Sequence, residues 1–114
     1  TTIIIPLSFT IVSYVFSDDG DIVIKTIQDL QEMLDEGESM HHCVFANKYY
    51  AKNSSLILTA KDNNGVRLET IEVDLKTFNV IQSRSKFNGV SPQHDRIVSL
   101  VEKNMKKIKK IAVA

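Results

Sequence analysis

Two histidines, the chain's only cysteine and two tyrosines lie within Ser39–Tyr50, which reads SMHHCVFANKYY. A thiol and an imidazole can form a nucleophile and its base, but His42 and Cys43 are adjacent, and neighbours on a helix or strand do not face each other. A catalytic pair would need Cys43 with a histidine brought in by the fold, and His94 is the one that is remote in sequence. A buried, inert cysteine is the alternative.

Neither a metal site nor a cofactor is predicted from these residues. Structural zinc sites use pairs of cysteine and histidine ligands at short, regular spacings. Here a single cysteine is accompanied by His41, His42 and His94, and the paired spacings are missing. We therefore expect the chain to hold no metal ion and no cofactor.

A β-hairpin and a helix are predicted to precede this stretch. Phe9–Phe16 is rich in β-branched and aromatic residues, and a turn signal at 17–20 separates it from a short β-branched run at 21–24. Thr26–Asp29 has the form of a capping box, so a helix is expected to begin there and to end at Gly37. Its apolar face is expected to contain Ile27, Leu30, Met33 and Leu34, and its acidic outer face Asp29, Glu32, Asp35 and Glu36.

A three-stranded meander is predicted to follow the stretch. Leu56–Lys61 and Val66–Asp74 have strand-like composition and are separated by Asn64-Gly65, a dipeptide that favours a tight hairpin turn. Phe78–Lys86 supplies the third strand. Because each strand follows the last through a short turn, the three should pair in antiparallel order.

The last predicted element is a helix that runs to the end of the chain. Ser91 is placed as its N-cap and Pro92 as its first residue. Apolar residues then recur at helical spacing, at Ile97, Leu100, Val101, Met105 and Ile108. The order of elements predicts the α+β class: an antiparallel sheet, made of an N-terminal hairpin and a three-stranded meander, with two helices packed on one face.

Polar residues interrupt the apolar pattern of the last two strands. Strand alternation places Gln82 and Arg84 on one face of the last strand, and Thr70 and Glu72 on one face of its neighbour with Glu69 on the other. Polar groups are therefore expected inside the sheet or at its rim, where each must be paired. A hydrogen-bonded network that ties a helix to the sheet is one interpretation, and a binding site is the other.

Five lysines gather near the end of the chain, in the run KNMKKIKK. Residues 1–40 contain eight acids and one base, whereas residues 41–114 contain six acids and thirteen bases, although the net charge is zero. The lysines could neutralise phosphates, and Tyr49 or Tyr50 could stack on bases. A solvated helix end explains the lysines equally well, and the neutral total argues against a domain whose main affinity is for duplex DNA. The candidate phosphate-binding residues are Lys106, Lys107, Lys109 and Lys110.

Length and composition describe one ordinary folded domain over residues 1–114. With 43% hydrophobic and 25% charged residues, a chain of 114 residues can build a single core. One cysteine cannot form an internal disulfide, which favours a reducing, cytoplasmic location. No apolar run approaches the roughly 20 residues that cross a bilayer, so no membrane association is expected. The chain does not begin with Met, which suggests a piece excised from a longer protein.

Four short motifs carry a resemblance to a known family. They are His42-Cys43-Val44, Tyr50, Glu69-Thr70-Ile71-Glu72, and the set Gln82, Arg84 and Asn88. In this order they resemble the motifs of the PcfJ-like family, whose proteins accompany bacterial conjugative plasmids and related mobile elements. The resemblance covers most of the chain, with a C-terminal type of domain. The chain departs from the family at Ser85, where glycine is frequent.

Two hypotheses for function follow. The resemblance implies a bacterial, cytoplasmic protein but supplies no activity, so the first hypothesis is a non-catalytic accessory or interaction domain of a mobile-element system. It would bind a protein partner or nucleic acid through its sheet edge or basic helix, with Arg84, Lys86 and the C-terminal lysines as contacts. The alternative is an enzyme or small-ligand site. Its residues would be His42, Cys43, Gln82, Arg84 and Asn88.

Overall fold

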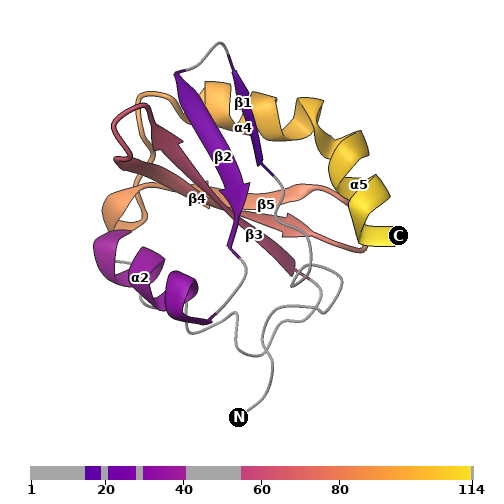
Figure 1. The fold of residues 1–114 in the computed structure, drawn as a ribbon, viewed down its shortest axis with the longest axis horizontal. Helices are drawn as coiled ribbons and strands as arrows, with labels where there is room; N and C mark the ends of the chain where they lie inside the picture. Colours follow the sequence, from indigo (N-terminus) through magenta and orange to yellow (C-terminus); the bar gives the residue numbers. More distant parts are fainter. Residues whose placement is uncertain (1–14, 19–20, 28–29, 41–54, 114) are drawn as a thin grey trace.

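Five strands form one antiparallel sheet in which each strand pairs with the next in the chain (Figure 1). The computed structural model describes residues 15–18, 21–27, 30–40 and 55–113. Within these ranges the strands are β1 Val15–Asp18, β2 Ile22–Thr26, β3 Ser55–Asp62, β4 Arg67–Asp74 and β5 Val80–Arg84. The predicted hairpin and meander are both confirmed, and β2 joins them by pairing with β3.

The β3–β4 turn has the predicted Asn-Gly chemistry. Gly65 adopts a φ of 79°, in the region that glycine enters without the steric cost of a Cβ. The Asp62 carboxylate accepts hydrogen bonds from the amides of Asn64 (2.8 Å) and Val66 (3.0 Å). This local network holds the turn closed and fixes the register of the two longest strands of the sheet.

The helix after β2 begins and ends later than the sequence predicted. Thr26 is the last residue of β2, where it pairs with Leu58, and Ile27 still donates its amide to Ile57 (2.9 Å). Helix α2 spans Leu30–Met40 and runs through Gly37. The predicted glycine stop is therefore wrong, because the helix continues past Gly37. The predicted capping box includes residues 28–29, which lie outside the described ranges, so it stays a prediction.

Two helical segments replace the single predicted C-terminal helix. They are α4 His94–Lys103 and α5 Met105–Val113, and a short 3-10 segment, η1 Lys86–Asn88, precedes them. Asn104 separates α4 from α5, and its side-chain amide donates to the Leu100 carbonyl at 2.8 Å. This side-chain bond competes with the regular backbone pattern and interrupts the helix. None of the helices in the described ranges is long and apolar enough to span a membrane.

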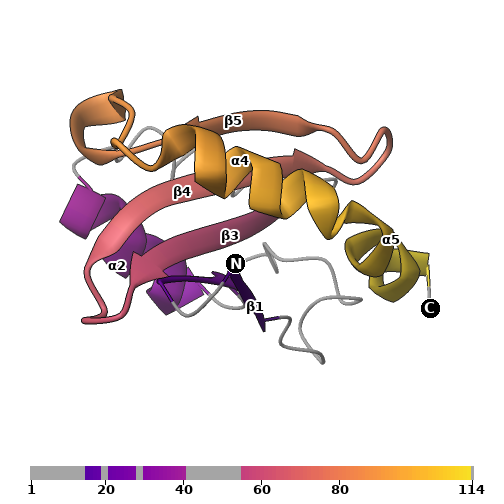
Figure 2. The same ribbon diagram turned by 90° about the horizontal axis from the view of Figure 1, so that it is seen from above.

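The helices lie on opposite faces of the sheet, and the prediction that both share one face needs correction. Figures 1 and 2 show the sheet between α2 on one side and α4 with α5 on the other. Hydrogen bonds from adjacent residues of β4 confirm this arrangement, because Thr70 contacts α2 and Glu69 contacts α4. Successive side chains of a strand point to opposite faces, so the two helices cannot share one.

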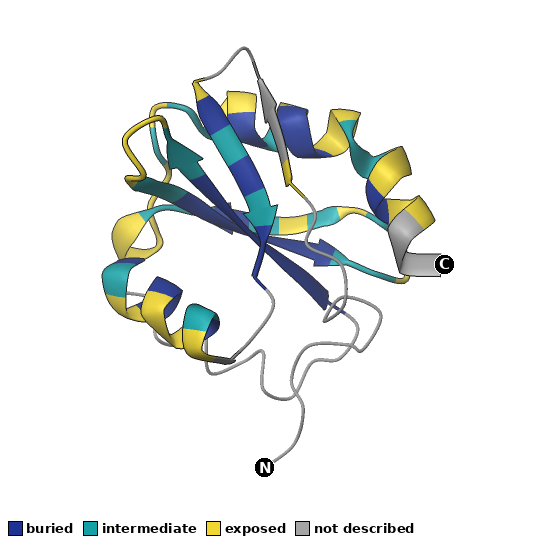
Figure 3. Cartoon of the chain, viewed as in Figure 1, coloured by how far each residue is buried: buried dark blue, intermediate teal, exposed yellow. Residues whose placement is uncertain are grey.

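The apolar core fills the face covered by α4 and α5 (Figure 3). Leu58 and Ile71 from the sheet and Ile97 and Val101 from α4 are fully buried there. Ile108 continues this packing into α5, as the helical spacing predicted. The opposite face, beneath α2, is largely polar, and the candidate residues Gln82 and Arg84 lie on it.

Replacing Ile71 by alanine tests the position of the core. Ile71 is 0% exposed, so Ile71→Ala should lower the free energy of unfolding by about 2 to 5 kcal/mol through lost burial and a new cavity. Ile81 is the matched control, because it is 49% exposed and Ile81→Ala should cost about 1 kcal/mol or less. Urea denaturation measures both values, and equal losses would contradict this core.

Candidate functional site

The sheet face beneath α2, here called the polar face, contains Gln82 and Arg84, two of the residues that the sequence singled out. Two cross-strand rows define it: Lys25, Thr59, Thr70 and Arg84 in one row and Ile57, Glu72 and Gln82 in the next. The predicted sharing of a face by Gln82 and Arg84 is confirmed, since they oppose Glu72 and Thr70. Residues of three separate segments therefore meet on one surface.

Glu72 is the buried acid at one end of the polar face. Its carboxylate is 0% exposed and accepts hydrogen bonds from the Ser55 hydroxyl (2.7 Å) and the Gln82 amide (3.0 Å). A buried carboxylate without donors would be strongly destabilised, so these two bonds hold β3 and β5 to β4. Gln82 thus acts first as a structural partner of Glu72.

Glu36 is a second buried acid on this face, and it comes from α2. It accepts a hydrogen bond from Arg67 Nε at 2.8 Å and another from the Thr70 hydroxyl, while Arg67 also donates to Ser39 at 3.1 Å. The sequence placed Glu36 on the solvent side of the helix. That prediction is wrong, because Met33, Glu36 and Met40 are spaced by three and four residues and all three are buried.

Arg84 is half-buried at the edge of the polar face. Its guanidinium donates to the carbonyl of Ser83 at 3.2 Å, and it forms no ion pair within the ranges that the structure describes. A guanidinium carries five N–H donors in a planar fork, so most of its hydrogen-bonding capacity is not used by Ser83. Arg84 can therefore contact an anionic partner without breaking the fold.

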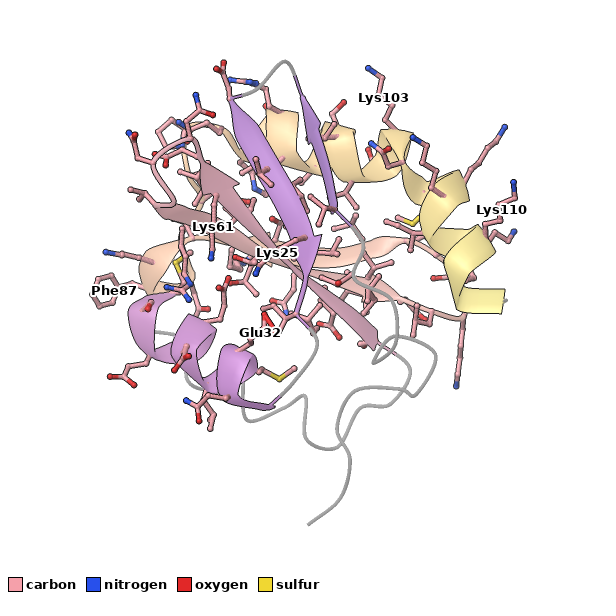
Figure 4. The ribbon with its side chains drawn as sticks, in the orientation of Figure 1. Lys25, Glu32, Lys61, Phe87, Lys103 and Lys110 are labelled. Carbon is pink, nitrogen blue, oxygen red and sulfur yellow. The ribbon has the colours of Figure 1, made fainter. Side chains whose placement is uncertain are left out.

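Two lysines and a glutamate converge between β2 and α2, as Figure 4 shows. Lys25 and Glu32 form a long ion pair of 3.8 Å, and Lys61 lies beside them. Burial lowers the pKa of the Lys61 ammonium, and the nearby charges of Arg67 and Lys25 lower it further, while Glu36 and Glu32 act in the opposite direction. Sequence reasoning did not single out either lysine.

The opposite face of β4 carries a hydrogen-bonded centre around Glu69. This carboxylate is 0% exposed and accepts from the Ser83 hydroxyl (2.5 Å) and from both the amide (2.8 Å) and the hydroxyl (2.7 Å) of Ser91. His94 Nδ1 lies 2.8 Å away and donates its proton to the carboxylate. Ser91 therefore binds Glu69 and does not cap α4 as the sequence predicted; the N-cap is Gln93, which makes no side-chain capping bond.

These bonds set the charge state of Glu69. Burial by itself would raise the pKa of the Glu69 carboxyl, but hydrogen bonds from Ser83, Ser91 and His94 outweigh burial and lower the pKa from its ordinary value of 4.5. Glu69 is therefore ionised at neutral pH. It ties β4 to β5 and to the start of α4.

Asn88 lies away from the polar face, in η1, where it is exposed. Two residues close to position 85, Phe87 (φ 56°) and Asn88 (φ 62°), adopt left-handed conformations, whereas Ser85 has an ordinary φ of −89°. A serine at position 85 therefore causes no backbone strain here. The Ser85 amide donates to the Gly89 carbonyl at 2.8 Å and closes the loop.

The C-terminal lysines form a separate surface. Lys106, Lys107, Lys109 and Lys110 are exposed on α5 (Figure 4 labels Lys110). The Lys109 ammonium lies 5.7 Å from the centre of the Phe78 ring, on the side of the molecule away from the polar face. The predicted binding residues are therefore divided between the polar face, η1 and α5.

Three of the predicted residues, His42, Cys43 and Tyr50, lie outside the described ranges, so their roles stay predictions. Among the residues that the structure does describe, no three His, Cys, Asp or Glu side chains are arranged to hold a metal ion. A thiol pocket with Gln82 and Arg84 remains the hypothesis that the sequence raised. In the described part of the chain, Thr70 and Glu72 lie opposite Arg84 and Gln82, and Glu36 accepts a hydrogen bond from Thr70.

Replacing Glu69 tests the hydrogen-bonded centre. Glu69→Gln should lower the free energy of unfolding at pH 7 by about 3 kcal/mol, because an amide cannot accept from all the donors around it. The folded-state pKa is lowered, so the stabilisation is complete above pH 4.5 and is lost as pH falls through the folded-state value. The difference between parent and variant should therefore shrink in acid.

Asp95→Asn is the matched control, since Asp95 is an exposed acid on α4, the helix whose start Glu69 holds. Chemical denaturation of the three proteins at several pH values measures the effect. Two results would show that Glu69 does not hold α4 as an ionised group. One is a Glu69→Gln variant as stable as Asp95→Asn, and the other is a difference in unfolding free energy between parent and Glu69→Gln that grows as the pH falls.

Comparison with known proteins identifies the family. The family model described as PcfJ-like protein matches residues 9–98, which include the polar face, the Glu69 centre and the start of α4. A search of curated proteins and a search of solved structures gave no match. The match covers well over half of the chain, and the protein belongs to the PcfJ-like family.

Proposed function

We propose that this domain binds nucleic acid through the phosphate backbone, using the outer surface of α4 and α5. This surface, here called the basic face, consists of Lys103, Lys106, Lys107 and Lys110. The four lysines are spaced by three or four residues, so they project from one side of the two helical segments. Their arrangement is the single observation that carries the proposal.

The lysines of the basic face are not neutralised by the protein itself. All four are exposed, and none forms an ion pair with a residue in the described ranges. Helix α5 contains no acidic residue. Figure 4 shows Lys103 and Lys110 pointing outward into solvent. Positive charge that is exposed and unpaired attracts phosphates and releases their counterions on binding.

Among the described residues, no exposed aromatic side chain lies beside the basic face, which favours backbone binding over base stacking. Phe78 is partly buried beneath Lys109, and the exposed aromatic residue of the described ranges is Phe87, in η1 at the far side of the sheet. Proteins that bind single strands usually combine lysines with exposed rings. The basic face therefore suits a duplex, whose charge density is higher, and carries no element that reads sequence.

The neutral total charge is compatible with such binding because the charges are segregated. Helix α2 presents Asp35 and Glu38 to solvent on the other side of the sheet, away from the lysines. A local patch on a neutral protein gives weaker binding than a uniformly basic domain, because it neutralises fewer phosphates. We extend the proposal to an accessory role in the cytoplasm of a bacterium that carries a conjugative plasmid or a related mobile element, and family membership supports this extension.

A salt titration tests the proposal. The parent domain should bind a 20-base-pair duplex at low salt, and the logarithm of its affinity should fall linearly with the logarithm of salt concentration. Replacing Lys103, Lys106, Lys107 and Lys110 by glutamine should flatten that slope by roughly 3 to 4 if each contacts a phosphate. Fluorescence anisotropy at five or more salt concentrations measures the slope.

Single substitutions supply the matched control. Lys110→Gln should flatten the slope by about 0.9, whereas Lys86→Gln, which removes the same charge from η1, should leave it unchanged. A single-stranded 20-mer should bind more weakly than the duplex. No binding at low salt, or equal effects of the two substitutions, would refute the basic face as the binding surface.

A further inference from the structure

A cluster of three cationic side chains and one threonine lies on the polar face, on the side of the sheet away from α5. It consists of Lys25 from β2, Thr59 and Lys61 from β3, and Arg67 from β4, and we call it the Thr59 cluster. The strand register places Lys25 opposite Thr59, and Lys61 opposite Arg67. Neither the family match nor the sequence motifs point to it.

Thr59 carries a buried hydroxyl without a partner. The residue is 2% exposed, and its Oγ1 atom makes no hydrogen bond to the described part of the chain. Buried polar groups are nearly always paired, because an unpaired hydroxyl loses its bond to water and gains nothing in return. The Thr59 hydroxyl is therefore a free donor enclosed between β2, β4 and the cationic side chains, and an acceptor from outside the chain would satisfy it once the side chains that cover it move apart.

The acids nearby do not supply that acceptor. Glu36 already accepts from Arg67 and from Thr70 with its two oxygens. The Lys25–Glu32 contact is long, at 3.8 Å, and Lys61 forms no ion pair with any residue in the described ranges. Lysine has three donors and no acceptor, so the cluster contains more donors than the protein satisfies.

The charges of the site favour an anion. Three cations, Lys25, Lys61 and Arg67, face two carboxylates, Glu32 and Glu36, which leaves one positive charge in excess. Lys25 and Lys61 turn toward the same space between β2 and α2 (Figure 4). Residues 59 and 61 are alternate positions of one strand, about 7 Å apart, and a tetrahedral anion can bridge them with two of its oxygens.

We propose that the Thr59 cluster binds a phosphate group, with the Thr59 hydroxyl and the Lys61 ammonium as direct donors and Lys25 as a supporting charge. Arg67 holds its place through Glu36 and adds to the positive potential. The group is either inorganic phosphate or the phosphate of a small monoester, since both offer the same oxygens. The site is independent of the basic face, because the sheet separates the two.

The protonation behaviour of Lys61 agrees with this assignment. Burial, Arg67 and Lys25 lower the pKa of Lys61 in the free protein, and Glu36 and Glu32 only partly oppose them. A dianion placed beside the ammonium would favour its charged form and raise this pKa. Phosphate binding should therefore be accompanied by an upward shift of the Lys61 titration, which a purely structural lysine would not show.

Thr59→Val gives the sharpest test, because valine keeps the shape of threonine and removes the hydroxyl. The unpaired hydroxyl is absent from this variant, so its melting temperature without phosphate should equal or exceed that of the parent. Its affinity for inorganic phosphate, measured by calorimetry at constant ionic strength with chloride as the balancing anion, should fall about tenfold or more. Thr59→Ser, which keeps the hydroxyl, should retain the parent affinity.

Two further variants keep the test decisive if Thr59→Val folds poorly. Lys61→Met should weaken phosphate binding by at least about tenfold, whereas Lys86→Met, at an exposed lysine outside the cluster, should leave it unchanged. Amide shifts of Thr59 and Lys61 in NMR spectra locate the site, and the Lys61 side-chain resonances report its pKa with and without phosphate.

The ligand source is resolved by comparing inorganic phosphate with ribose 5-phosphate. Saturable binding of either compound to the parent, with loss of that binding in Thr59→Val or in Lys61→Met, supports the site. Tighter binding of ribose 5-phosphate than of inorganic phosphate identifies an organic phosphate as the ligand. Absence of saturation in the parent, equal affinity in Lys61→Met and Lys86→Met, or an unchanged Lys61 pKa in the presence of phosphate would overturn the proposal.

Discussion

Burying a carboxylate obliges a protein to surround it with donors, and three such groups organise this domain. Glu36 attaches α2 to β4, Glu72 attaches β3 and β5 to β4, and Glu69 attaches the start of α4 to the same strand. Each carboxylate is almost fully buried, and each is paired. Because β4 supplies two of them and the threonine that binds the third, this strand determines where both helices lie.

The alternating directions of the β4 side chains explain why one face of the sheet is apolar and the other is polar. Ile71 and Val73 join the apolar core with α4, and Glu69 lies at the edge of that core. Thr70 and Glu72 point the other way, onto a face that α2 covers through polar contacts. One face therefore supplies the hydrophobic stabilisation, and the other can retain charged groups for binding at little cost to the core. This division keeps the Thr59 cluster apart from the basic face.

Local signals in the sequence predicted the sheet well but not the placement of its helices. The Asn64-Gly65 turn and the alternation of β3, β4 and β5 are short-range features, and all are confirmed. The end of α2 and its position on the opposite face depend on how the helix packs against the sheet, which local propensity does not capture. The break at Asn104 depends on a side-chain hydrogen bond that competes with the helix backbone. Glu36 was misplaced for the same reason.

The candidate site was predictable only where one strand or one helix determines it. Alternation correctly grouped Gln82 with Arg84, and helical spacing placed the lysines of α5 on the surface. The bonds of Glu69 to Ser91 and His94 join residues more than twenty positions apart, and the unpaired hydroxyl of Thr59 depends on everything packed around it. His42, Cys43 and Tyr50 keep their predicted status. A carbon-detected NMR titration of the Glu69 carboxyl tests the central claim most directly: this account predicts a pKa below 4.5, and a value at or above 4.5 would contradict it.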